Sequence, residues 1–345
     1  MSFLPRGRRF CEDAPRDMRA RKPTRTLMLV LCPTLVLCFL YYSAARLQLR
    51  IWGFKALYDK QGFLRKLDGK LFSKPAPMFL DLNFKRLSKI NTYPPPFGIK
   101  TQEKIIKLIL AHTKNYGLGS ELDSLNCKRC IIIGNGGILS NKSLGSKIDE
   151  YDVVIRLNKA PISGFERDVG SKTTMRITYP EGAIQYPERY ENHSLFVFSA
   201  FKPLDFKWLR QMVFKERLHH TEGFWKSVAL VVPRDPEDMR ILNPYFIQEA
   251  AFWFIGLPHN NGLMGHGNIP TLGTVAIAMA LHNCDEVAVA GFGYDMNTPR
   301  APLHYYESVR MATIKESWTH NILKEKEFLR KLVIAGVIQD LTKGI

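Results

Sequence analysis

The stretch CIIIGNGG at residues 130–137 joins an apolar run, mostly β-branched, directly to a turn rich in glycine. This pattern is typical of a strand buried in a parallel sheet. Helical patterns, beginning with an amphipathic segment at 103–112, separate it from further strand-like runs at 152–157, 195–199 and 286–290. The sequence therefore predicts an α/β fold, with a mostly parallel, Rossmann-like central sheet flanked by helices. Ligands are expected beyond the carboxyl ends of the strands.

The glycine turn at 134–137 does not match the dinucleotide fingerprint. G-x-G-x-x-G requires a third glycine at position 139, where the sequence has Leu139. A fitting ribose-binding acid is also missing about 20 residues further on, at a strand end. These observations contradict a nicotinamide-dependent oxidoreductase and leave the binding of another nucleotide open.

A second loop, PTLGT at 270–274, opens a helix of small residues that extends to His282. The first N–H groups of such a helix and its dipole favour an anion, so this end is a candidate phosphate site. The sequence alone leaves an alternative open, in which Thr271 is a plain N-cap on a buried helix.

The basic residues are concentrated near the N-terminus. The chain has 345 residues and a formal net charge of +17. Residues 1–45 hold 8 Lys/Arg against 3 Asp/Glu and residues 46–100 hold 12 against 3, which leaves 29 against 26 for the remainder. Because nucleic-acid binding requires a basic face on the folded domain, this distribution does not favour it.

Residues 26–45 form an uncharged run of 20 residues. At 1.5 Å per residue, a helix of this length spans a hydrocarbon core of about 30 Å. Eight basic residues precede the run, which predicts a cytoplasmic N-terminus. We therefore predict a type II membrane protein, with a cleaved signal peptide as the alternative. Its parts are a cytoplasmic tail (1–25), a signal-anchor transmembrane helix (26–45), a proline-punctuated stem (46–98) and a lumenal domain (99–345).

A lumenal domain can form disulfides and carry N-glycans. Its cysteines are Cys127, Cys130 and Cys284, and an odd number allows at most one intramolecular bridge. Cys130 begins one predicted strand and Cys284 directly precedes another, so a bridge between neighbouring strands is geometrically reasonable. Asn141-Lys-Ser and Asn192-His-Ser are glycosylation sequons, and the second lies in the more loop-like sequence.

Four motifs, in order along the chain, resemble those of the animal sialyltransferases. Residues 127–174 are similar to the large sialyl motif, 269–293 to the small one, HYYE at 304–307 to the third and HNILKE at 320–325 to the very small one. The resemblance implies a GT-A-like variant of the α/β fold on a Golgi membrane anchor. It also implies transfer of sialic acid from CMP-sialic acid to the 3-OH of terminal galactose on N-acetyllactosamine-type glycans of glycoproteins or glycolipids.

The same resemblance assigns roles to single residues. His320 would be the general base that takes the proton of the galactose hydroxyl, and His304 would donate to the phosphate of the departing CMP. The resemblance also pairs Cys130 with Cys284. The remaining expected contacts to the CMP moiety are Asn135, Asn158, Thr271, Gly273 and Gly293.

Other residues in these motifs receive structural interpretations. In a continuous helix Glu325 would lie about 140° around the axis from His320. It would orient that ring only if the helix begins after His320, for example with Thr319 as N-cap, and we interpret Glu325 as structural. We interpret Arg156 and Asp168 as a buried ion pair.

The sequence lacks two features that bear on the disulfides and on metal binding. The stem has no cysteine to pair with Cys127, so this thiol is predicted to be free or to link two chains in a homodimer. Asp-x-Asp occurs nowhere in the chain, and CMP has only one phosphate to neutralise, so we expect an inverting single displacement without a metal cofactor. The alternative function is a catalytically impaired, membrane-tethered protein that binds a nucleotide or glycan.

Overall fold

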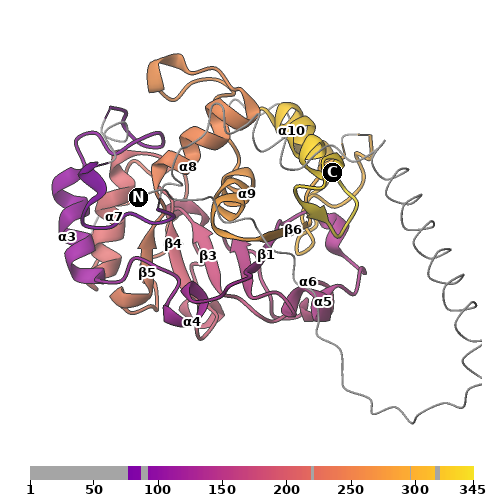
Figure 1. Cartoon of the computed structure of the whole chain (residues 1–345), viewed down its shortest axis with the longest axis horizontal. Coiled ribbons are helices and arrows are strands. Elements are labelled where there is room, and N and C mark those ends of the chain that lie inside the picture. Colours follow the sequence, from indigo (N-terminus) through magenta and orange to yellow (C-terminus); the bar gives the residue numbers. More distant parts are fainter. Residues whose placement is uncertain (1–76, 87–91, 219–220, 296, 315–318) are drawn as a thin grey trace, which may run out of the picture.

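The structure, a computed structural model, describes residues 77–86, 92–218, 221–295, 297–314 and 319–345. Within these ranges, one sheet has the strand order β5-β4-β3-β2-β1-β6-β7 (Figure 1). Every pair of neighbouring strands is parallel. The predicted α/β fold with a mostly parallel sheet is therefore confirmed. The strands are β1 (Arg129–Ile133), β2 (Val153–Leu157), β3 (Met175–Thr178), β4 (Leu195–Phe198), β5 (Met239–Ile241), β6 (Glu286–Ala290) and β7 (Gln339–Asp340).

Four of these strands were predicted from their apolar runs, namely β1, β2, β4 and β6. The other three lack a continuous apolar run: β3 (Met-Arg-Ile-Thr) and β5 (Met-Arg-Ile) are short and contain an arginine, and β7 has only two residues, both polar. The predicted helix at 103–112 is present as α3 (Glu103–Thr113). The helix predicted after Pro270 is α9 (Leu272–Asn283), with Thr271 as its N-cap.

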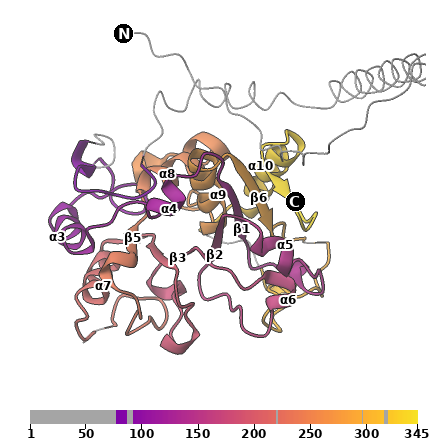
Figure 2. The ribbon, with the colours of Figure 1, turned by 60° about the horizontal axis from the view of Figure 1, so that its bottom comes forward.

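Helices cover both faces of the sheet (Figures 1 and 2). The α-helices besides α3 and α9 are α4 (Ser120–Asp123), α5 (Gly145–Asp149), α6 (Glu166–Val169), α7 (Pro203–Val213), α8 (Pro244–Gln248) and α10 (Ile322–Ile334). The segment η6 (Glu249–Ile255) is a π-helix. Short 3₁₀ turns are η1 (Phe84–Arg86), η2 (Gly137–Leu139), η3 (Pro180–Gly182), η4 (Pro187–Arg189), η5 (Pro236–Asp238), η7 (Asn260–Gly262) and η8 (Met311–Thr313).

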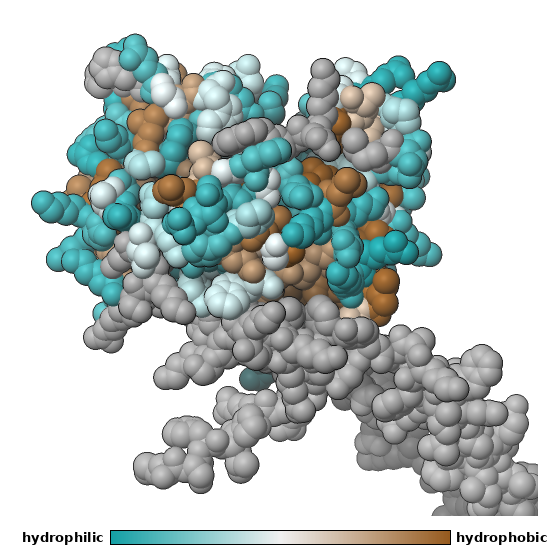
Figure 3. Space-filling view, turned by 90° about the horizontal axis from the view of Figure 1, so that it is seen from above, coloured by the Kyte–Doolittle hydropathy of each residue, from teal (hydrophilic) through white to brown (hydrophobic). Residues whose placement is uncertain are grey.

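The core consists of apolar clusters on the two faces of the sheet. On one face, α8, η6, α9 and α10 pack against alternate residues of the strands, such as Ile132 and Val197. On the other face, α3 and α7 cover Phe196 and Phe198 of β4, while α5 and α6 cover the region around Ile131. Seen from above, the surface is mostly hydrophilic, with hydrophobic residues in small groups (Figure 3).

Part of the segment that we assigned to the stem belongs to the folded domain. Phe79, Leu80, Phe84 and Phe97 are at most 1% exposed. The backbone of Leu80 donates to the carbonyl of Ile241 at the end of β5 (2.9 Å). The predicted signal-anchor at 26–45 lies outside the described residues. Among the residues that are described, no helix is both long and apolar enough to cross a membrane.

The chain order places a topological switch point between β1 and β6. From β1 the sheet grows through β2 to β5, and the chain then returns to add β6 on the other side of β1. The two glycine loops that follow these strands bind each other: Gly134 N–H donates to Ala290 (2.7 Å) and Gly136 N–H donates to Gly291 (3.0 Å). Such a point is where a crevice forms in open parallel sheets.

Arg156 and Asp168 do not form the ion pair that we predicted. The buried guanidinium of Arg156 donates to the carbonyls of Val169 (2.8 Å) and Lys172 (2.8 Å). Asp168 instead accepts the N–H groups of Asn141 and Ser143, both at 2.8 Å. The prediction was wrong because backbone groups in turns, rather than opposite charges, satisfy both side chains.

Cys130 and Cys284 form a disulfide, as expected. It links β1 to the residue before β6, and these strands are neighbours, with Cys130 opposite Val287. Cys127 is disulfide-bonded as well, so the prediction of a free thiol was wrong.

Removing the Cys130–Cys284 bridge is expected to lower the free energy of unfolding. The bridge spans 154 residues of sequence, and the chain-entropy model gives about 4–5 kcal/mol for a loop of this size. Urea unfolding of Cys130→Ala and of the double variant Cys130→Ala/Cys284→Ala should show equal losses, because either change removes the same bond. An unchanged unfolding midpoint in both variants would contradict the expectation.

Candidate active site

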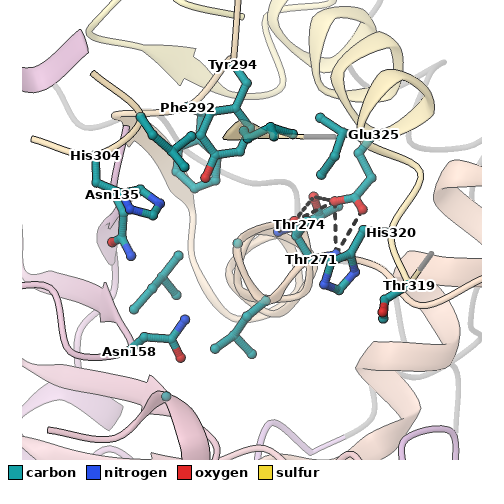
Figure 4. Close-up of a pocket in the computed structure, with 18 of the residues that line it drawn as sticks. Asn135, Asn158, Thr271, Thr274, Phe292, Tyr294, His304, Thr319, His320 and Glu325 are labelled. Atoms are coloured by element: carbon teal, nitrogen blue, oxygen red, sulfur yellow. Dashed lines mark hydrogen bonds between the residues drawn. The ribbon is translucent and has the colours of Figure 1, made fainter. Parts of the chain in front are cut away.

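A cavity of about 920 Å³ lies at the carboxyl ends of the strands and is lined by residues from all four recognised motifs. Figure 4 shows His304 and Asn135 on one side of it, His320 and Thr319 on the opposite side, and Asn158 below. All seven predicted catalytic and donor-binding residues line this cavity: Asn135, Asn158, Thr271, Gly273, Gly293, His304 and His320. Residues up to 185 positions apart in sequence thus meet at one site.

His320 has one ring nitrogen fixed by the backbone. Its Nδ1 lies 2.8 Å from the carbonyl oxygen of Ile269. A carbonyl only accepts hydrogen bonds, so Nδ1 carries the proton, and in the neutral ring the lone pair is on Nε2. The backbone connection is reciprocal, since Ile269 N–H donates to Thr319 (3.3 Å). The atom that can accept a proton on the neutral ring is therefore Nε2.

Glu325 joins α10 to the start of α9. Its carboxylate, only 3% exposed, accepts hydrogen bonds from the backbone N–H of Thr271 (2.9 Å) and from the hydroxyls of Thr271 (2.5 Å) and Thr274 (2.6 Å). Burial raises the pKa of Glu325, and the threonine hydrogen bonds and the charge of His320 oppose that shift. An internal carboxylate thus already occupies the anion-favouring end of α9.

The helical geometry that we considered for Glu325 does not apply. Asn321, not Thr319, is the N-cap of α10, and its side chain accepts from the backbone of Lys324 (3.0 Å). The helix therefore begins after His320, so His320 and Glu325 are not confined to the 140° separation. Asparagine is among the strongest N-cap residues, so Asn321 was a signal in the sequence that would have placed this boundary.

His304 is oriented by a carboxylate from its own motif. Its Nδ1 hydrogen-bonds Glu307, and its ring stacks on Tyr306 with the centroids 5.4 Å apart. The backbone around it pairs with the first glycine loop: Gly137 N–H donates to Leu303 and Tyr305 N–H donates to Asn135. When protonated, the ring presents Nε2–H as a hydrogen-bond donor.

The two asparagines stand directly after neighbouring strands. Asn135 follows β1, and its side-chain oxygen is buried without a hydrogen-bond partner in the described structure. Asn158 follows β2 in a left-handed backbone conformation (φ 53°), and its side-chain oxygen lies 3.4 Å from the hydroxyl of Thr178. Amide groups offer both donors and acceptors to a ligand.

The two predicted glycines line the cavity, and neighbouring protein atoms leave no room for a side chain at either position. A Cβ on Gly273 would lie 2.7 Å from the ring of Phe292, and one on Gly293 would lie 1.8 Å from the carbonyl oxygen of Gly344. The hydroxyl proton of Thr271 is committed to Glu325. Gly273 is the second residue of α9, and at that position a backbone N–H has no intrahelical acceptor.

The groups that orient the histidines, namely Ile269, Glu307 and Glu325, could not be recognised from the sequence patterns. Tyr294 in the cavity wall was not predicted either, and its pKa is raised to about 12 by burial and by the charges of Glu325 and Glu307.

Both sequon asparagines, Asn141 and Asn192, are exposed. In the described part of the chain, no group of three His, Cys, Asp or Glu residues is arranged to hold a metal ion.

Comparison with known proteins identifies relatives over nearly the whole chain. The family model for glycosyltransferase family 29 (sialyltransferase) matches residues 79–337. The CMP-N-acetylneuraminate-beta-1,4-galactoside alpha-2,3-sialyltransferases of Mus musculus and Homo sapiens are each 60% identical, over 93% of this chain and 98% of theirs. The Lactosylceramide alpha-2,3-sialyltransferase of Homo sapiens is 44% identical, over 73% of this chain and 62% of its own.

A solved structure agrees with these matches. The crystal structure of a mammalian sialyltransferase in complex with Gal-beta-1-3GalNAc-ortho-nitrophenol has a TM-score of 0.62 and 25% identity, and the match covers 80% of this chain and 94% of that one. The resemblance inferred from the four motifs is therefore confirmed, and the chain belongs to glycosyltransferase family 29, the sialyltransferases.

Proposed function

We propose that this protein transfers sialic acid from CMP-sialic acid to the 3-OH of terminal galactose on N-acetyllactosamine-type glycans. The observation that carries the proposal is the placement of His320 and His304 on opposite sides of one cavity, each with Nδ1 engaged by a protein group. Relatives that match nearly the whole chain act on beta-1,4-galactosides according to their names, which favours a Galβ1-4GlcNAc acceptor over Galβ1-3GlcNAc.

The two histidines suit the two halves of an inverting displacement. Nε2 of His320 would take the proton of the galactose hydroxyl as that oxygen attacks the anomeric carbon. The CMP phosphate would leave from the opposite face, where His304 would donate Nε2–H to a phosphate oxygen. A nucleophile and a leaving group on opposite sides of the reacting carbon give inversion in a single step.

The donor would lie across the switch point of the sheet. We assign the side chains of Asn135 and Asn158 and the backbone at Gly273 and Gly293 to the CMP moiety. The hydroxyl of Thr271 donates to Glu325, so Thr271 would contribute to phosphate binding only indirectly, by holding the start of α9 in place. No metal is needed in this scheme because CMP carries a single phosphate and the chain has no Asp-x-Asp sequence.

We further propose that the catalytic domain is a GT-A-like variant, anchored in the Golgi membrane by residues 26–45 with residues 1–25 in the cytoplasm. A basic spacer from residue 46 would lead to the domain, and Asn192 and Asn141 would carry N-glycans. The support is the uncharged run with eight preceding basic residues and the exposure of both asparagines. A homodimer remains a prediction from the sequence.

Replacing His320 tests the catalytic assignment. Sialyl transfer from CMP-sialic acid to N-acetyllactosamine by the full-length protein should persist in EDTA, and His320→Ala should lower kcat at least 100-fold, because general-base catalysis contributes about 10²–10⁴-fold. His112→Ala changes an exposed histidine on α3, outside the cavity, and is expected to retain full activity.

Other results would change the assignment. Undiminished turnover by His320→Ala would exclude His320 as the base. Loss of transfer in EDTA would show that a metal is required. A folded wild-type protein that binds CMP but transfers nothing would favour the alternative, a membrane-tethered binding protein.

Glu325→Gln should lower kcat roughly tenfold or more while CMP still binds. The amide of glutamine is uncharged, so it cannot stabilise a protonated His320. It also places a donor where the carboxylate accepted hydrogen bonds from Thr271. Each hydrogen bond to a charged group contributes about 1.5–3 kcal/mol, which is the reason for the expected loss. Glu327→Gln is the matched control, because that carboxylate lies on the same helix but is exposed and pairs with Lys331 (2.9 Å). Equal kcat values for the two variants would contradict a positioning role for Glu325.

A further inference from the structure

Four lysines line the cavity, and the ammonium groups of two of them are ion-paired or hydrogen-bonded within the protein. The ammonium of Lys202 lies 2.6 Å from Glu181 and 2.8 Å from Asp205. Lys326 donates to the carbonyl of Tyr294 (2.9 Å). The other two, Lys159 and Lys226, make neither a hydrogen bond nor an ion pair with any residue that the structure describes.

Lys159 and Lys226 come from different parts of the chain, but their positive charges interact. Lys159 directly follows Asn158, whose left-handed backbone ends β2. Lys226 lies in a loop held by its neighbours: the ring of Trp225 packs on Tyr179 at 5.8 Å, and Ser227 binds the side chain of Gln185 at 2.8 Å.

The positive charges of the two lysines also oppose each other. Burial lowers the pKa of Lys226, the charge of Lys159 lowers it further, and the charge of Glu181 opposes both effects. Two ammonium groups that repel each other in the wall of a cavity, and that have no hydrogen bond or ion pair in the described structure, favour a ligand that brings negative charge.

The substrates of the proposed reaction differ in charge. CMP-sialic acid carries two anionic groups, the phosphate diester and the carboxylate, both attached to the anomeric carbon. N-acetyllactosamine is neutral. The start of α9 offers the donor less positive potential than a free helix end, because the carboxylate of Glu325 already occupies it.

We propose that Lys159 and Lys226 are donor-binding residues, which together attract and hold the anionic part of CMP-sialic acid. This inference rests on the proposed function and adds to it a charge-dependent contribution to donor affinity. It concerns attraction through the open cavity and requires no direct contact with either anionic group.

The test compares a charged nucleotide with the uncharged nucleoside that it contains. Dissociation constants for CMP and for cytidine are measured by calorimetry on the full-length protein and on Lys159→Met/Lys226→Met. Methionine keeps the apolar stem and removes the charge. The control is Lys104→Met/Lys107→Met, which removes the same charge from exposed positions on α3 outside the cavity. Thermal unfolding of each variant verifies that it is folded.

Loss of the lysine pair should weaken CMP binding roughly five- to tenfold, the effect of two partly screened charges, and change cytidine binding less than twofold. The weakening of CMP binding by added NaCl should be flatter in this variant than in the wild type. In steady-state transfer, the KM for CMP-sialic acid should rise while the KM for N-acetyllactosamine stays unchanged. The control variant should match the wild type in every measurement.

Three results would overturn the inference: equal weakening of CMP and cytidine, no weakening of either, or a rise confined to the KM of the acceptor. The first would indicate loss of packing, and the last would place the lysines in the acceptor site. The proposed function fails separately, if the wild-type protein neither binds CMP nor transfers sialic acid, and the inference would fail with it.

Discussion

The carboxylate of Glu325 is the interaction on which the geometry of the site depends. A buried charge is unfavourable unless several donors satisfy it, and here the backbone of Thr271 and two threonine hydroxyls do so. These bonds fasten the first turn of α10 to the first turn of α9. His320 lies just before one helix and Ile269 just before the other, so fastening the helices also sets the Nδ1 hydrogen bond of His320, the residue that we propose as the general base.

The sheet imposes a second constraint on the opposite side of the cavity. Because β1 and β6 are neighbours and both end in glycine loops, their backbones bind each other directly at Gly134 and Gly136. The HYYE segment then pairs with the same loop, with Tyr305 N–H donating to Asn135. His304 and Asn135 therefore share one backbone framework, which the Cys130–Cys284 bridge ties at the other ends of the strands.

The sequence was informative where a pattern is local and strong. Apolar runs predicted four strands, and the small-residue segment after Pro270 predicted α9 with its N-cap. Short strands such as β7, with two residues, have no such pattern. They are defined by backbone hydrogen bonds to a neighbouring strand, which for β7 is β6. The partners of Arg156 and Asp168 are backbone groups in turns, and no sequence pattern encodes these. The family resemblance predicted the residues that line the cavity. The groups that hydrogen-bond the two histidines could be identified only from the structure.

The balance of charge in the cavity connects these observations. A helix N-terminus is the usual way to bind a phosphate without a metal, but α9 already holds the carboxylate of Glu325. That arrangement fixes His320, the proposed base, and lowers the positive potential that this helix end could offer to a donor phosphate. Groups elsewhere in the cavity must then attract the two negative charges of CMP-sialic acid. His304 lies beside Glu307, Lys202 beside two carboxylates and Lys326 donates to a carbonyl. Of the four lysines in the cavity wall, Lys159 and Lys226 are therefore the two without a hydrogen bond or ion pair to a residue that the structure describes. In this site, the same helix end cannot both position the base through an internal carboxylate and provide the main attraction for the donor.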